Sequence, residues 1–193
     1  MIRIAIAALL GTLSLSSFAA LKEGEAAPAF QLQASLAGKA FSYSLKDALK
    51  SGPVVVYFYP SAYTNGCNLQ AHTFAVNYEK FRETGASVVG VSLDSIARLN
   101  DFSADPDYCA GKLPVASDAD GRVARAFELA VRDAATGRTD TRGKEIDHGF
   151  AERTTFVVTP DGKIAATIGG LAPAQNVDKA LEVVQAIART GRK

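Results

Sequence analysis

Cysteine is scarce in this chain, with Cys67 and Cys109 the only two among 193 residues. An even count permits a disulfide in an exported protein, but two cysteines do not make a disulfide scaffold at this length. The fold must therefore be held by a hydrophobic core. The sequence also lacks a Cys-x-x-Cys pair, which argues against a disulfide oxidoreductase.

An excess of one charge is absent as well. The formal net charge is +1, and acidic and basic residues are interspersed along the chain. No block of basic residues indicates a nucleic-acid or membrane surface, so we expect no partner of either kind for the mature protein. Internal repeats and low-complexity segments are also lacking, which favours a single globular domain.

A long apolar run is the third absence. Residues 4–15 are mostly apolar, but a transmembrane helix needs about 20 such residues. Arg3 precedes this run and small residues at 17 and 19 follow it, which is typical of a secretory signal peptide. We therefore predict a signal peptide over residues 1–19, one domain over residues 20–193, and a periplasmic or otherwise exported location. An uncleaved anchor or a buried first helix is the alternative.

The rest of the chain alternates strand and helix patterns. Residues 54–59 form an apolar run rich in valine and aromatics, which predicts a central strand buried on both faces. Residues 67–84 have apolar side chains every three or four positions and predict a helix, and residues 87–92 predict a second strand. This order indicates a parallel β-α-β unit and an α/β fold.

Further elements are predicted on both sides of this unit. Pro114 lacks the N–H that a central strand donates, so we expect residues 113–116 to form an edge strand. The other expected elements are an N-terminal hairpin (30–33 with 40–43), a short helix (45–49), a helix capped by Ser95 (96–104), a helix (122–128), a long loop or irregular hairpin (132–148), a second hairpin (154–158 with 163–168) and a closing helix (176–189).

Cys67 has the most informative position in the chain. It follows the apolar strand and begins the predicted helix. Free backbone N–H groups and the positive end of the helix dipole favour a thiolate at such a position. Because the thiolate is the nucleophilic form, Cys67 is a candidate catalytic residue.

The residues around Cys67 resemble a known family. Pro60, Thr64 and Cys67 match the peroxiredoxin pattern Pro-x-x-x-Thr-x-x-Cys, and the run 153–156 (Arg-Thr-Thr-Phe) also resembles that family. The chain is most similar to the Q-type branch, the bacterioferritin comigratory protein group. The resemblance implies a thioredoxin-like fold, in which helices flank a central mixed sheet and an N-terminal hairpin is present.

The resemblance also implies a role for each matched residue. Cys67 would attack the peroxide, and Thr64 would offer its hydroxyl to the thiolate or to a peroxide oxygen. Pro60 would shield the sulfur, and Arg153 would place its guanidinium beside it. The implied activity is the reduction of hydrogen peroxide and organic hydroperoxides, without a cofactor or a metal.

Two positions depart from the family pattern. Many Q-type members have a second cysteine five residues after the first, where this chain has His72. Typical members have a glutamate three residues after it, where this chain has Gln70. In the family, the second cysteine is the resolving cysteine, which attacks the oxidised first one. The first departure means that this role belongs to another residue or is absent, and the second puts any charged role at position 70 in doubt.

Cys109 is the only other thiol and lies in a loop-like stretch that we expect to be exposed and able to move. We predict that it attacks the sulfenic acid formed on Cys67, while the first turn of the Cys67 helix unwinds. A thioredoxin-like dithiol would then reduce the disulfide. Alternatively, Cys109 is a packing residue. We expect a monomer or a weak dimer.

Other functions remain open at this point. A thioredoxin-fold copper carrier would use the two cysteines and a histidine, although such carriers usually pair neighbouring cysteines. A redox-binding module without catalysis is a further alternative. We expect His72 and His148 to lie on polar faces.

Overall fold

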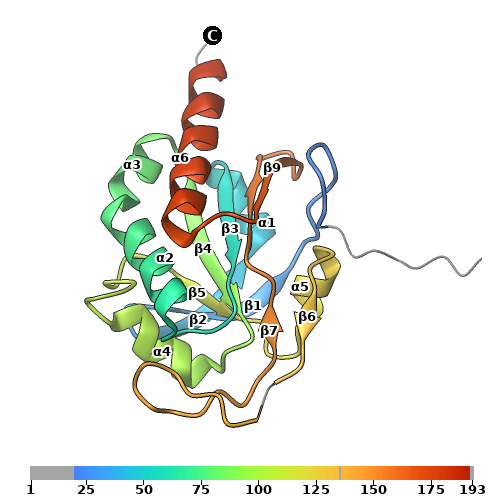
Figure 1. Ribbon diagram of the computed structural model, residues 1–193. Coiled ribbons are helices and arrows are strands. Elements are labelled where there is room, and N and C mark those ends of the chain that lie inside the picture. Colours follow the sequence, from blue (N-terminus) through green and yellow to red (C-terminus); the bar gives the residue numbers. More distant parts are fainter. Residues whose placement is uncertain (1–19, 135, 192–193) are drawn as a thin grey trace, which may run out of the picture.

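The computed structural model describes residues 20–134 and 136–191, so the predicted signal peptide at 1–19 lies outside the described residues. Its centre is a seven-stranded sheet in the order β2-β1-β5-β4-β3-β8-β9 (Figure 1). The strands are β1 (Gln31–Leu36), β2 (Lys39–Ser44), β3 (Val54–Phe58), β4 (Ser87–Ser92), β5 (Val115–Ser117), β8 (Thr154–Val158) and β9 (Ile164–Gly169). A separate two-stranded sheet pairs β6 (Val131–Arg132) with β7 (Phe150–Ala151).

The pairing of the strands confirms the predicted mixed sheet. β3 pairs in parallel with β4, which itself pairs in parallel with β5. β8 pairs antiparallel with both β3 and β9, and the N-terminal hairpin of β1 and β2 adds the other edge. All five residues of β3 are buried, as expected for a strand covered on both faces.

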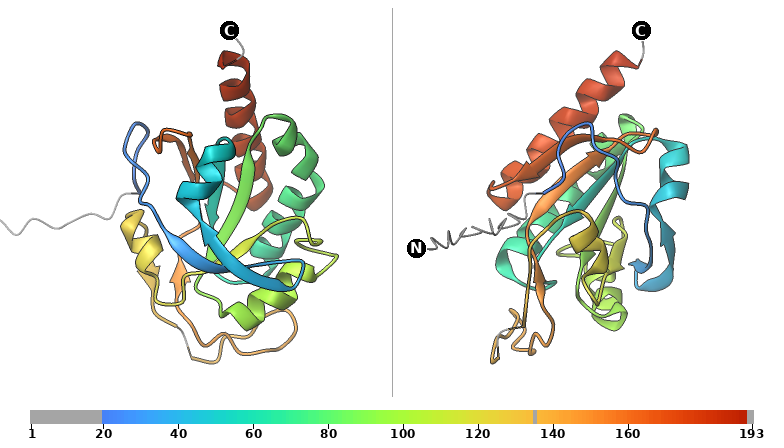
Figure 2. Two further views of the ribbon diagram at one scale, coloured as in Figure 1. Left: turned by 180° about the vertical axis from the view of Figure 1, so that it is seen from behind. Right: turned by 90° about the vertical axis from the view of Figure 1, so that its right-hand side faces the viewer.

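Helices cover both faces of the sheet, and the side view of Figure 2 shows α6 and α1 on opposite sides of it. Alternate side chains of β3 divide the core: Val55 and Tyr57 join the cluster under α2, α3, α4 and α6, whereas Val56 and Phe58 join the cluster under α1 and α5. The helices are α1 (Leu45–Ala48, continued by a 3-10 turn over Leu49–Ser51), α2 (Asn65–Val76), α3 (Tyr78–Glu83), α4 (Ile96–Ala104), α5 (Arg122–Ala126) and α6 (Pro173–Thr190).

The long helix predicted over residues 67–84 is wrong in one respect, because the structure divides it into α2 and α3. The break falls at Asn77, whose backbone leaves the helical region and whose side-chain amide donates to the carbonyl of Thr73 at 2.9 Å. Asparagine competes in this way with the backbone bonds of a helix. The closing helix also starts three residues earlier than predicted, at Pro173, where the missing N–H costs nothing.

The strand at residues 113–116 is not an edge strand. β5 lies between β1 and β4 in the interior of the sheet. Pro114 precedes the strand rather than lying within it, and its carbonyl accepts a hydrogen bond from the N–H of Gly90 at 3.0 Å. The proline therefore needs no N–H in the ladder, and the strand can be internal.

The remaining predicted elements are confirmed with small shifts of their ends. Ser95 caps α4, accepting a hydrogen bond from the N–H of Arg98 at 3.3 Å. The described part of the 132–148 loop contains one isolated bridge, between Thr139 and Glu145. Within 20–134 and 136–191, no helix is both long and apolar enough to cross a membrane.

Candidate active site

Cys67 lies in the first turn of α2, directly beyond the end of the central strand β3. Its side chain is only 1% exposed. Thr64 occupies the position before the helix in an extended conformation, and its carbonyl accepts the N–H of Asn68 at 2.8 Å. The strand and the helix therefore fix the sulfur at the positive end of the α2 dipole, as the sequence predicts.

Arg153 provides the partner of the sulfur. It precedes β8, the antiparallel neighbour of β3, and its Nη2 donates to Cys67 Sγ at 3.3 Å. Gly66 makes room for this contact, since a Cβ there would lie 3.2 Å from Arg153 Nη2 and 3.5 Å from Pro173 Cγ. The placement of Arg153 implied by the family resemblance thus agrees with the observed contact.

Gln70 contacts the Arg153 guanidinium, and Asn176 in turn contacts Gln70. Arg153 Nη1 donates to Gln70 Oε1, and Gln70 Nε2 donates to Asn176 Oδ1 at 3.0 Å. The same Asn176 oxygen accepts from the hydroxyl of Thr155 at 2.6 Å, and its Nδ2 donates to the carbonyl of Ile168 at 2.9 Å. Both amides are completely buried. Gln70 therefore supports Arg153 as a neutral acceptor, without the charge of a glutamate.

Pro60, Thr64 and Arg153 line one cleft of about 490 Å³, and Arg153 connects this cleft to the Cys67 sulfur. The Thr64 hydroxyl donates to the carbonyl of Ser61 at 2.9 Å, so it does not donate to the thiolate. Its lone pairs are free to accept the O–H of a peroxide. The rest of the lining consists of two arginines, two larger apolar residues and four others: Arg132, Arg138, Ile146, Phe150, Ala130, Thr139, Ala151 and Glu152.

Cys109 departs from its predicted exposure, because its side chain is completely buried. Burial, with a further contribution from Asp105, raises the pKa of the Cys109 thiol well above its ordinary value. The two cysteines are both free and belong to one hydrophobic cluster. Burial also raises the pKa of Tyr57, and Cys109 and then Cys67 add to this rise.

The two histidines have different surroundings. His72 is exposed, as predicted, and its Nδ1 lies 2.9 Å from the carbonyl oxygen of Asp107. His148 has polar surroundings, as predicted, but its side chain is only 11% exposed and its Nε2 lies 2.8 Å from the wholly buried carboxylate of Asp94. Asp94 lies just beyond β4 and also accepts from the Ala62 N–H in the turn that leads to Cys67. No group of three or more potential ligands for a metal ion occurs within 20–134 and 136–191.

Comparison with known proteins agrees with this geometry. The model of the AhpC/TSA family matches residues 24–167, which is most of the chain. The chain belongs to the AhpC/TSA family. A putative peroxiredoxin of Mycobacterium tuberculosis is 37% identical over 144 residues, which cover 75% of this chain and 82% of that protein.

Two solved structures of AhpC/TSA relatives are similar in fold as well as in sequence. Peroxidoxin BcpB from Mycobacterium tuberculosis has a TM-score of 0.71 and 31% identity, covering 86% of this chain and 98% of its own. The bacterioferritin comigratory protein of Xanthomonas campestris has a TM-score of 0.64 and 28% identity, covering 81% of this chain and 92% of its own. The thioredoxin-like peroxiredoxin fold and the activity of a thiol-dependent peroxidase follow, and the copper carrier is not supported.

Several polar residues of this AhpC/TSA site are missed by sequence reasoning. Asn176 is interpreted as the start of a helix, although it lies inside α6 and faces the core. Its spacing of four residues from Ala180 places it on the apolar stripe, which is the signal that could have revealed it. Asp94 gives no comparable signal, because only the packing of β4 against the 61–64 turn makes it part of the site.

Proposed function

We propose that Cys67 of this peroxiredoxin reduces hydrogen peroxide and organic hydroperoxides, with Arg153, Thr64 and Pro60 forming the site. The single observation that carries this assignment is the 3.3 Å contact between Arg153 Nη2 and Cys67 Sγ at the start of α2. An arginine remains protonated at any pH at which the protein works. It stabilises first the thiolate and then the negative charge that develops on the departing oxygen.

The reaction breaks the O–O bond of the peroxide. The Cys67 sulfur attacks the terminal O–H oxygen and forms an S–O bond, while the O–O bond breaks and the other oxygen, which carries a hydrogen or the alkyl group, leaves and takes up a proton as water or an alcohol. Thr64 accepts the O–H of the incoming peroxide and so orients it, because its own proton is committed to the Ser61 carbonyl. Pro60, in the wall of the cleft, limits the access of water to the sulfur.

The dimensions of the cleft support organic hydroperoxides as substrates. Its volume of about 490 Å³ exceeds the space that hydrogen peroxide needs, and Ile146 and Phe150 supply apolar lining. The similar protein of Xanthomonas campestris is described for its alkyl peroxide reduction activity. We therefore expect this chain to reduce a hydroperoxide with an alkyl substituent as well as hydrogen peroxide.

Cys109 is our candidate for the second step. Its thiol would attack the sulfur of the Cys67 sulfenic acid, forming a disulfide and releasing water. The attack requires a thiolate, and burial raises the pKa of Cys109, so the turn at residues 105–112 must first open. Peroxiredoxins in general use thioredoxin-like reductants, and we propose such a dithiol for this chain.

The mutation that tests the first step is Cys67→Ser. We expect it to abolish peroxide consumption in the presence of a thioredoxin system. Cys109→Ser is the matched control, because it also removes one buried thiol, yet it should retain one equivalent of peroxide reduction per chain. Full consumption by the Cys67→Ser protein would exclude Cys67 as the nucleophile.

The second step is tested by mass spectrometry. Protein treated with one equivalent of peroxide and digested without reductant should yield a linked peptide containing Cys67 and Cys109. Recovery of an unlinked, oxidised Cys67 peptide, or of a disulfide between two chains, would contradict the assignment of Cys109.

We further propose that the mature protein acts in an exported compartment as a monomer or a weak dimer. The pattern of residues 1–19 supports export, and Leu21 is already tied to the domain by bonds to Phe127 and Thr167. The exposed large apolar side chains of the described residues are spread over several elements: Leu36, Phe41, Leu69, Val76 and Leu171. Cell fractionation with N-terminal sequencing tests the location, and sedimentation tests the assembly.

A further inference from the structure

Asp94 is a charged residue that the proposed chemistry does not use. It follows the end of β4, and its side chain is completely buried. Burial of a carboxylate is costly unless hydrogen bonds and opposite charges compensate for the lost water. The identity of its partners therefore indicates what the residue does.

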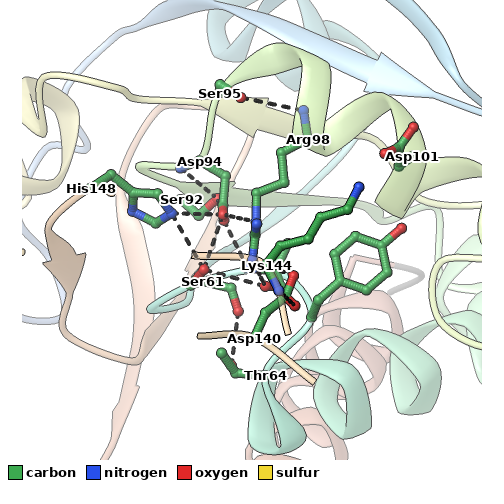
Figure 3. A network of polar contacts seen from close by, with 12 residues as sticks. Ser61, Thr64, Ser92, Asp94, Ser95, Arg98, Asp101, Asp140, Lys144 and His148 are labelled. Carbon is green, nitrogen blue, oxygen red and sulfur yellow. Dashed lines mark hydrogen bonds and ion pairs between the residues drawn. The ribbon is translucent and has the colours of Figure 1, made fainter. Parts of the chain in front are cut away.

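Five groups surround the carboxylate, as Figure 3 shows for the side chains. The first oxygen accepts from the Ser61 hydroxyl at 3.0 Å and lies 2.8 Å from His148 Nε2 and 2.9 Å from Arg98 Nε. The second oxygen accepts from the Ala62 N–H at 2.8 Å and from the Ser92 hydroxyl at 2.7 Å. Two of these five groups belong to one short segment, the turn that connects β3 to α2.

The backbone carbonyls of Ala62 and Tyr63 in the same turn also accept hydrogen bonds. Arg98 Nη2 donates to the Ala62 carbonyl at 3.0 Å and to Asp140 at 2.8 Å. The N–H and the hydroxyl of Thr141 both donate to the Tyr63 carbonyl at 2.9 Å. The loop at residues 138–148 is thereby fastened to the turn through Asp140, Thr141 and His148.

The backbone of the turn requires such support. Tyr63 has a φ of +62°, in the left-handed region that a bulky residue rarely adopts. Conformations of this kind cost about 1–3 kcal/mol and persist when surrounding contacts impose them. Arg142 covers the Tyr63 ring at 3.2 Å from its centre and is itself held by Asp140.

The turn determines where the reacting groups lie. The Ser61 carbonyl accepts the Thr64 hydroxyl at 2.9 Å, and α2 begins one residue after Thr64. We propose that Asp94 is a positioning residue for peroxide reduction, which holds the Ser61–Ala62 segment so that Thr64 and Cys67 keep their places beside Arg153. This inference rests on the proposed function of Cys67.

Ser61→Ala and Ser92→Ala make a matched pair for the test. Each removes one hydroxyl that donates to the Asp94 carboxylate, and both serines are completely buried. Only Ser61 lies on the turn. We expect Ser61→Ala to lower the single-turnover rate of peroxide reduction at least fivefold, and Ser92→Ala to leave that rate within twofold of the native value at a similar melting temperature.

Asp94→Asn tests the carboxylate itself, because an amide keeps the shape but loses the charge and one acceptor. We expect the folded variant to lose at least tenfold in kcat/KM, and its pH–rate profile to differ from that of the native protein. Equal rate losses in both serine variants, in proportion to their losses of stability, would overturn the proposal and leave Asp94 a stabilising residue. A native rate and profile for Asp94→Asn would overturn it also.

The failure of this inference is distinguishable from failure of the proposed function. If Cys67→Ser still consumes peroxide, the nucleophile is wrong. If Cys67→Ser is inactive while Asp94→Asn and Ser61→Ala react at the native rate, the nucleophile is right and Asp94 has no positioning role.

Discussion

Gly66 leaves the space that the Arg153 guanidinium occupies beside the sulfur of Cys67. In Gly66→Ala the new Cβ would lie 3.2 Å from Arg153 Nη2, so the flexible guanidinium has to move. At 3.2 Å the guanidinium must give by a few tenths of an ångström, and a displacement of about 1 Å at a reacting centre can cost ~100-fold in rate. We therefore expect peroxide reduction to fall by about threefold, as measured by stopped-flow kinetics.

The stability of Gly66→Ala should not fall with its activity. Alanine is favoured over glycine inside a helix by about 1 kcal/mol, and Gly66 lies in α2. Gly169→Ala is a suitable control, because its Cβ would make an ordinary contact at 3.6 Å with Thr154 Oγ1. A native rate in Gly66→Ala would show that the guanidinium tolerates a shift.

His148 makes the contacts that hold the 61–64 turn through Asp94 dependent on pH. Burial lowers the pKa of His148, but the hydrogen bond and charge of Asp94 raise it by more, so the net pKa lies above the ordinary value. Arg98 also pairs with the Asp94 carboxylate and lowers the pKa of His148, and it is linked further to Asp140, which pairs with Arg142. A raised pKa means that protonated His148 stabilises the fold below its ordinary pKa, and that this contribution is lost as pH rises through the folded value.

The measurement is the free energy of unfolding from about pH 6 to about pH 9. The difference between the native protein and His148→Gln should be largest at the acidic end and shrink as pH rises. His72→Gln is the control, because His72 is exposed and lies near no carboxylate in the described contacts. If the difference in free energy of unfolding between the native protein and His148→Gln stays constant with pH, or grows as pH rises, the raised pKa of His148 is contradicted.

At the residue scale, the place of Cys67 in the first turn of a helix follows from the strand–helix junction in the sequence, whereas Arg153 is placed beside it by the family resemblance and not by a local pattern. The burial of Cys109 and the pairing of His148 are not predictable in this way. Polar neighbours in the chain make residues 105–112 resemble an exposed loop, yet that loop packs Cys109 into the cluster under α4. Such long-range packing leaves no periodic signal.

At the scale of elements, patterns of burial predict the order of strands and helices, whereas the ends of the elements depend on single polar residues. The break between α2 and α3 at Asn77 and the internal place of β5 next to Pro114 both show this. In each case, one side chain or carbonyl finds a hydrogen bond that the apolar pattern does not reveal.

Asn176 connects α6 to three other elements and provides a test at this scale. It lies on α6, accepts from Gln70 on α2 and from Thr155 on β8, and donates to Ile168 on β9. In Asn176→Ala these buried groups lose their partners, and each such loss costs about 1–3 kcal/mol. We expect the free energy of unfolding to fall by about 3 kcal/mol, as measured by urea denaturation.

The control for Asn176→Ala is Gln175→Ala, which changes the adjacent but exposed residue of the same helix. It should change the stability by less than about 0.5 kcal/mol. Asn176→Ala should also slow peroxide reduction, since Gln70, which supports Arg153, would lose its hydrogen bond to residue 176. An unchanged stability in Asn176→Ala would mean that water replaces the amide at no cost.

At the scale of the whole molecule, both cysteines lie in one hydrophobic cluster on the face of the sheet that α2 and α6 cover. A disulfide between them requires the two sulfurs to approach to about 2.05 Å with a restricted dihedral angle. The first turn of α2 and the turn at residues 105–112 carry these sulfurs, whereas β3, β4 and β8 carry neither. Oxidation should therefore loosen two segments and leave the sheet intact.

Hydrogen exchange of the oxidised and reduced proteins tests this expectation. The amide of Asn68 bonds the Thr64 carbonyl at 2.8 Å, and those of Ala110 and Gly111 bond the Asp105 and Ser103 carbonyls at 2.9 Å. These amides should exchange faster after oxidation, while the amides of the central strands keep their protection. The oxidised Cys109→Ser protein should show no change over residues 105–112, because no disulfide forms. Faster exchange throughout the sheet would mean instead that the disulfide disrupts the whole cluster.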